Sequence, residues 1–225
     1  MTAAGIPTRD ILAKGSSHYN RFAGRGLERL CALSDGLFAI AMTIIVLEIH
    51  VPSPTVVTTE TALWSALGEL GPRVTTYFLS FLTLGIFWVG QQTGLTQLSR
   101  TDRHSTWINL AFLAFVAMMP FSTGLLAAFT SFRVAFLVYW ANIALMGFTL
   151  LLGWNYAERN DLVKDDVSRD VGRAIRRRIY SSQALYAIGA ALCLISTSWS
   201  IGFIVLVQLY YATSPRVSGL ARIMN

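Results

Sequence analysis

The feature that most constrains this chain is a series of apolar blocks, each long enough to cross a membrane. Charged residues make up only 13% of the 225 residues and hydrophobic residues 54%, whereas a soluble domain carries roughly 25% charged residues. This composition argues against a disordered chain and against an ordinary soluble enzyme. A spanning helix needs about 20 apolar residues. Four spans are predicted at about 30–49, 74–93 (with an alternative start near residue 64), 106–129 with a kink at Pro120, and 132–156.

The last apolar block, 180–212, is too long for one span. As a single helix it would measure about 50 Å, against a hydrocarbon core of about 30 Å. The polar run 196–200 lies in its middle, which predicts a helical hairpin and a sixth helix. A single long helix that extends into water is the alternative. The expected fold is therefore an all-α integral membrane protein with six transmembrane helices per subunit.

The distribution of charge predicts the orientation of these spans. Sixteen of the eighteen Lys and Arg residues lie in the segments 9–29, 100–103, 159–178 and 216–222. Because basic residues favour cytoplasmic connections, both termini are expected in the cytoplasm. A five-span arrangement would place Arg216 and Arg222 outside. The predicted organisation is an N-terminal tail (1–26), a transmembrane domain (27–213) and a C-terminal tail (214–225).

The net charge of +6 is interpreted as a topology signal, so the expected partner is the lipid bilayer and not a nucleic acid. The basic connection 157–178 is interpreted as a solvated cytoplasmic loop that can be helical, with contact to anionic lipids as the alternative. The sequence contains no HExxH, P-loop, nucleophile-elbow or CxxC motif. Its three histidines are scattered, and only Asp35 and Glu48 are acidic within the spans. We therefore expect no enzyme, no cofactor and no resident metal.

The first predicted helix has one apolar stripe. With about 100° per residue, the stripe centred on Ile40 includes Leu33, Gly36, Thr43, Ile44 and Leu47. From periodicity alone it is a packing face or a lipid face. Ser34 and Asp35 point elsewhere, and a carboxylate inside a membrane is functional or structurally paired by default. A polar clamp between helices is favoured over a proton relay.

Two stretches of the sequence resemble a known family. The first is Arg29-x3-Leu33-Ser34-Asp35-Gly36-Leu37-Phe38-Ala39-Ile40, followed by Thr43 and Leu47-Glu48-Ile49. The second contains Trp88, Asn109 and the segment Met119-Pro120-Phe121. Together they are similar to the transmembrane protein 175 family of potassium channels, which are lysosomal in animals and have prokaryotic members. The resemblance covers about residues 27–125.

The resemblance implies a homotetramer whose first helices line a central pore. Ile40 would form the tightest constriction, Ile44 and Leu47 would form further apolar rings, and Thr43 matches a position linked to potassium preference. A structural network behind the pore helix would contain Arg29, Ser34, Asp35, Trp88 and Asn109. The sequence departs from the family at Leu33, which replaces a phenylalanine, and at Gln91 and Gln92, which replace two histidines. Any pH dependence resting on those histidines would be lost.

The leading functional hypothesis is a modestly potassium-selective channel that conducts potassium ions passively. The expected location is a prokaryotic plasma membrane. Glu48, near the end of the helix, either concentrates cations at the mouth or caps the helix at the interface. A secondary transporter, proton-coupled through Asp35, is an alternative, although no inverted repeat is visible in the sequence. The second alternative is a non-conducting membrane scaffold.

Overall fold

The computed structural model describes residues 26–193 and 196–213, and all of its regular elements there are helices. The elements are α2 (Leu27–Ile44), the short 3-10 helix η1 (Ile45–Glu48), α3 (Glu60–Glu69), α4 (Gly71–Thr96), α5 (Arg103–Ala117), α6 (Met119–Ala128), α7 (Arg133–Arg159), α8 (Arg169–Leu192) and α9 (Thr197–Thr213). The predicted terminal tails lie almost wholly outside the described residues. The expectation of an all-α fold is confirmed for the part that the structure describes.

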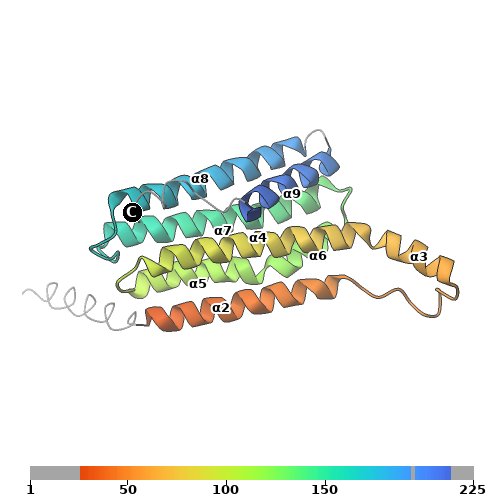
Figure 1. The fold of residues 1–225 in the computed structure, drawn as a ribbon, viewed down its shortest axis with the longest axis horizontal. Helices are drawn as coiled ribbons and strands as arrows, with labels where there is room; N and C mark the ends of the chain where they lie inside the picture. The colour runs from red at the N-terminus through yellow and green to blue at the C-terminus, as the bar shows by residue number, and fades with distance from the viewer. Residues whose placement is uncertain (1–25, 194–195, 214–225) are drawn as a thin grey trace, which may run out of the picture.

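The long helices run side by side in one elongated bundle (Figure 1). The α2 helix packs on α4 and α5 along one side, α7 packs on α5 and α6 in the middle, and α8 and α9 cover the opposite side. The core between them includes the fully buried side chains Phe38, Phe112, Phe136 and Tyr139. As a result, one side of α2 remains uncovered by any described part of the chain.

The first four predicted spans correspond to helices of the structure. They are α2 with η1, α4, the α5–α6 pair and α7, and each is long and apolar enough to cross a membrane. The predicted kink is present, because the helix breaks at Met118 and Pro120 stands in the first turn of α6. Proline has no backbone N–H and clashes with the preceding turn, which explains the break. Residue 64, the alternative start of the second span, belongs to α3, a separate helix.

The last apolar block forms a hairpin, as predicted, and not a single long helix. The α8 helix ends at Leu192, α9 begins at Thr197, and the two pack against each other. The first half of α8 carries many charged residues, and the apolar segment of α9, Trp199–Tyr211, is shorter than a full span. Four spans are therefore supported by length and composition, and the count of six stays a prediction. The connection 157–178 is partly helical, which the prediction allowed: residues 157–159 end α7 and residues 169–178 begin α8, so only 160–168 lie outside the two helices. The i, i+3 pair Asp170–Arg173 accompanies the start of α8.

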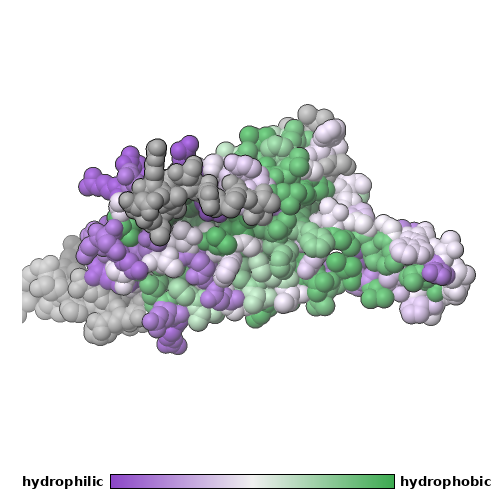
Figure 2. Space-filling view, viewed as in Figure 1, coloured by the Kyte–Doolittle hydropathy of each residue, from purple (hydrophilic) through white to green (hydrophobic). Residues whose placement is uncertain are grey.

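The two basic connections predicted to share one membrane side meet at the same end of the bundle. The backbone N–H of Ser99 donates to the carbonyl of Leu162 at 2.9 Å, and that of Lys164 donates to the carbonyl of Gln97 at 2.9 Å. Figure 2 shows hydrophilic residues gathered at the end where α8 begins, and an apolar zone over the middle of the bundle. This separation of polar end and apolar middle is what a membrane-spanning bundle requires.

Candidate functional site

The pore-helix candidate α2 has two faces of different character. The buried face presents Leu30, Ser34, Phe38 and Ala41, spaced three or four residues apart, toward α4 and α5. The opposite face carries the stripe singled out in the sequence. Ile40 is 58% exposed, Ile44 43% and Leu47 69%. The structure thus places these three side chains on one uncovered side of the bundle, although α2 gives way to η1 before Leu47.

Thr43 lies on the same exposed side as Ile40 and Ile44. Its hydroxyl donates to the backbone carbonyls of Ala39 and Ile40, both at 2.9 Å. Because the single hydroxyl proton is directed back to the helix, the oxygen lone pairs remain available on the outward side. Thr43 is therefore an oxygen ligand of the type that a dehydrated cation can use.

A polar clamp fastens the opposite side of α2 to α4. One carboxylate oxygen of Asp35, Oδ1, accepts from the indole Nε1 of Trp88 at 2.8 Å and from the amide Nε2 of Gln92 at 2.6 Å. Both bonds have a charged acceptor, which makes them stronger than bonds between neutral groups. Asp35 is thus paired with neutral donors from a neighbouring helix.

The neighbouring Ser34 is fully buried and belongs to a second part of the clamp. Its hydroxyl donates to the carbonyl of Leu30 at 2.9 Å and accepts from Nε2 of Gln91 at 3.2 Å. The same amide nitrogen of Gln91 lies 3.5 Å from Oδ1 of Asn109 on α5, and Asn109 itself donates to the carbonyl of Ser105 at 2.9 Å. The group therefore links three helices, α2, α4 and α5.

The structure brings together four of the five residues that the sequence assigned to a network behind the helix. These are Ser34, Asp35, Trp88 and Asn109. Arg29 is exposed, and within 26–193 and 196–213 no hydrogen bond or ion pair joins it to the other four. It lies six residues before Asp35, about 120° around the helix, so the two side chains leave α2 in different directions.

Gln91 and Gln92, which the sequence marks only as replacements for histidines, both belong to the clamp. In the structure both amides donate directly to α2, one to Ser34 and the other to Asp35. A signal was present, because Trp88, Gln91 and Gln92 are spaced i, i+3 and i+4 and so share one face of α4. What the sequence lacked was the pairing of this face with a particular turn of α2.

The other end of the exposed stripe is held by α4 and α6. Arg73 Nη1 lies 2.9 Å from Nδ1 of His50 and donates to the backbone carbonyl of Glu48 at 3.4 Å. The Glu48 side chain is half-buried against Gly124, where an added Cβ would lie 2.6 Å from Glu48 Oε2. Glu48 therefore packs toward α6, and its position favours the capping interpretation over a free carboxylate at a mouth.

Metal-ligand chemistry is not assembled in the part of the chain that the structure describes. No three His, Cys, Asp or Glu side chains there are grouped so that they could hold a metal ion. The arrangement consists instead of an uncovered apolar stripe and a clamp. The stripe contains one hydroxyl, which is hydrogen-bonded to its own helix, and the clamp joins the other side of α2 to its neighbours by hydrogen bonds. One face of α2 is thus held by neighbouring helices, and the opposite face is free to contact another surface.

Fold and site together define a multi-pass helical membrane protein whose first helix is clamped on one face and uncovered on the other. The model of the family described as the endosomal/lysosomal potassium channel TMEM175 matches residues 29–120. A potassium channel of Streptomyces collinus is 32% identical over 188 residues, which cover 81% of this chain and 90% of that protein. A potassium channel of Chamaesiphon minutus is 32% identical over 188 residues, covering 82% and 92%.

A solved structure agrees with these sequence relatives. The crystal structure of a lysosomal potassium-selective channel TMEM175 homolog from Chamaesiphon minutus has a TM-score of 0.71 and 30% identity, and the match covers 83% of this chain and 96% of that one. The chain belongs to the TMEM175 family, and the resemblance stated from the sequence is confirmed. Its bacterial relatives fit a prokaryotic membrane.

Proposed function

We propose that this protein is a cation channel with a modest preference for potassium, and that it conducts passively through a pore lined by α2 in a homotetramer. The potassium channels of Streptomyces collinus and Chamaesiphon minutus, each covered over about nine-tenths of its length, support the cation-channel class. In this proposal the transmembrane domain is 27–213, with six helices and both termini in the cytoplasm.

The observation that carries the proposal is the pattern of exposure along α2. Its polar side chains Ser34 and Asp35 are used to hold it against α4, whereas its apolar stripe is left uncovered. Four copies arranged around an axis would bring four such stripes together. From Ile40 to Leu47 the stripe rises about 10 Å, a length suited to a short, narrow constriction.

The proposed constriction works by controlling water. A ring of four Ile40 side chains, followed by rings of Ile44 and Leu47, would exclude water when narrow and so block ions that need hydration. Between these rings, the oxygens of Thr43 would replace part of the hydration shell of a potassium ion. The clamp of Asp35 with Trp88 would keep the stripe aligned, because it resists rotation of α2 about its own axis.

The clamp also bears on the two alternatives. A proton-coupled transporter would need Asp35 to exchange protons, whereas here its Oδ1 is occupied by two neutral donors. This pairing supports a structural role. A non-conducting scaffold would use the uncovered stripe only for assembly, and a flux measurement separates it from a channel.

The test is potassium flux from liposomes that contain the purified protein, comparing the wild type with Ile40→Asn. An amide in place of the isoleucine should wet the constriction, raise the flux several-fold and weaken the discrimination between potassium and sodium. Ile188→Asn is the matched control, since Ile188 is 51% exposed but lies on α8. No flux from folded wild type, or equal effects of the two variants, would contradict the proposal.

A further inference from the structure

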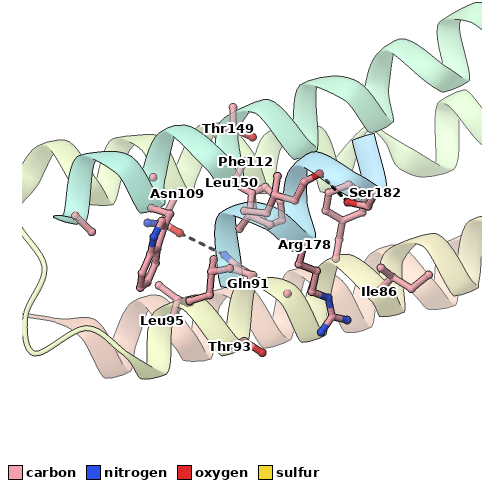
Figure 3. Close-up of a pocket in the computed structure, with 18 of the residues that line it drawn as sticks. Ile86, Gln91, Thr93, Leu95, Asn109, Phe112, Thr149, Leu150, Arg178 and Ser182 are labelled. Carbon is pink, nitrogen blue, oxygen red and sulfur yellow. Dashed lines mark hydrogen bonds between the residues drawn. The ribbon is translucent and has the colours of Figure 1, made fainter. Parts of the chain in front are cut away.

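A cavity of about 90 Å³ lies between α4, α5, α7 and α8, on the side of α4 away from the exposed stripe (Figure 3). Its walls are mainly apolar and include Phe87, Leu95, Phe112, Leu150 and Ile179. One water-sized group needs about 10–15 Å³ of such space. The cavity is therefore large enough for several water-sized or methylene-sized groups. It is separate from the proposed pore.

The cavity borders the part of α8 that lies beyond the described end of α9. The hydroxyl of Tyr211, near the end of the described part of α9, lies 3.2 Å from that of Ser181. From Ser181 back to its start at Arg169, α8 continues for three more turns with no described segment of α9 beside it. Small residues on the facing helices, Gly94 and Gly153, enlarge the space.

Three buried polar atoms of residues that line the cavity lack a hydrogen-bond partner among the described groups: Gln91 Oε1, Gln183 Nε2 and the hydroxyl of Tyr186. Gln91 is 1% exposed, and its carbonyl oxygen is the one amide acceptor among them. The orientation of the amide follows from Ser34, whose own proton goes to the carbonyl of Leu30, so Ser34 must accept from the Gln91 nitrogen. A buried acceptor without a donor is destabilising, and a ligand that supplies a donor would satisfy it.

An unpaired cation lies beside the same cavity. Arg178 lines it from α8 and is half-buried, and no hydrogen bond or ion pair joins its guanidinium to another described residue. Two other arginines of α8 are paired, Arg176 with Glu158 and Arg173 with Asp170. Arg178 is level with the part of α7 between Gly147 and Glu158, and its long side chain can reach the head-group zone while its stem stays in apolar surroundings.

We propose that this cavity binds an acyl chain of an anionic glycerophospholipid, with the phosphate held by Arg178 and a head-group hydroxyl donating to Gln91 Oε1. The apolar walls match the hydrocarbon, the guanidinium matches the phosphate, and the unpartnered oxygen matches the hydroxyl. A zwitterionic lipid offers a phosphate but adds a cation next to Arg178, so a lipid of the phosphatidylglycerol type fits better.

Occupancy of the site would be sensed by α2. Gln91 is the shared element, because it lines the cavity and has an unpartnered oxygen, while its nitrogen donates to Ser34. A lipid bonded to the oxygen would fix the amide and with it the clamp behind the exposed stripe. The lipid site itself does not depend on the channel proposal, since binding can be measured without any flux.

The experiment uses quenching of tryptophan fluorescence by brominated acyl chains. Trp154 lines the cavity and is 5% exposed, so its signal is isolated as the difference between the full-length protein and Trp154→Phe. The protein is placed in vesicles of phosphatidylcholine that contain increasing fractions of brominated phosphatidylglycerol, brominated phosphatidylcholine or brominated fatty acid. Arg178→Gln and Gly94→Leu test the site, and Arg177→Gln is the matched control.

The expected result is half-maximal quenching of Trp154 at about tenfold less phosphatidylglycerol than phosphatidylcholine. Loss of one charge-assisted contact should raise the required phosphatidylglycerol about tenfold in Arg178→Gln, while Arg177→Gln changes it less than twofold. Gly94→Leu, which fills the cavity without altering charge, should abolish the quenching. Retained folding in each variant is checked by its helical circular dichroism.

Several results would overturn the assignment. Equal quenching by the two phospholipids, or equal effects of Arg178→Gln and Arg177→Gln, would remove the anionic head group from the proposal. Binding of the fatty acid alone, with the same dependence on Arg178, would replace the diacyl lipid. Quenching that develops only after residues 214–225 are deleted would assign the cavity to the end of the chain itself.

Discussion

The hydrogen bond between Trp88 and Asp35 should make a measurable contribution to the stability of the bundle. The perturbation is a double-mutant cycle with Trp88→Phe and Asp35→Ala. Hydrogen bonds between membrane helices average about 0.6 kcal/mol, with values up to about 1.7 kcal/mol, and a charged acceptor strengthens the bond about twofold. The Nε1–Oδ1 distance of 2.8 Å is well within bonding range, so the expected coupling energy is about 1–2 kcal/mol.

Asp35→Ala alone should cost more than Trp88→Phe alone, because it also removes the bond from Gln92. The assay measures the free energy of unfolding of the purified protein. The protein is held in a mild detergent and titrated with a denaturing detergent. Trp107→Phe is the control for the aromatic change, since Trp107 is 62% exposed on α5. A coupling energy below about 0.3 kcal/mol, the usual error of additivity, would refute the clamp between α2 and α4.

Three further predictions test other parts of the protein. Thr43→Val keeps the shape of the side chain but removes its oxygen, and it should reduce the potassium-over-sodium permeability ratio measured from reversal potentials; an unchanged ratio would exclude Thr43 from selectivity. Gln92→Leu removes one of the two donors to Asp35 and should lower the free energy of unfolding by about 0.6–1.7 kcal/mol; an unchanged free energy of unfolding would contradict this. Gly189→Ala should lower the free energy of unfolding by about 1–3 kcal/mol, because the added Cβ would lie 2.8 Å from a side-chain atom of α9. Gly202→Ala, where the Cβ would have nothing within 4 Å, should be neutral or slightly stabilising. Equal unfolding midpoints for the two variants would show that α8 and α9 are not closely packed.

Local sequence predicted the helices well where hydropathy alone sets their limits. The first four spans, the break at Pro120 and the hairpin after Leu192 all follow from apolar length, from the missing N–H of proline and from a polar interruption. Hydropathy sets no limit for the start of α8, because residues 169–178 are polar and the sequence predicts only a solvated connection that can be helical. Its helical geometry there is supported by packing on α7, where the carboxylate of Glu158 contacts Arg176 and closely approaches Gly172.

The two faces of α2 show the division between sequence and structure most clearly. Periodicity alone established that Ile40, Thr43 and Ile44 share a stripe, because the helical repeat is a local property of the chain. It left open whether that stripe was buried, and only the placement of α4 and α5 on the opposite face showed it to be uncovered.

The partners of the clamp were decided by tertiary structure. Trp88 and Gln92 meet Asp35 across more than fifty residues of sequence, and the register between two helices depends on all the side chains packed between them. The cavity beside Gln91 has the same origin, since the residues that line it come from helices far apart in the sequence. Hydropathy and helical periodicity predict which segments are helical and which faces are polar. Which faces meet depends on the packed bundle, because contacts between distant segments are a property of the whole structure.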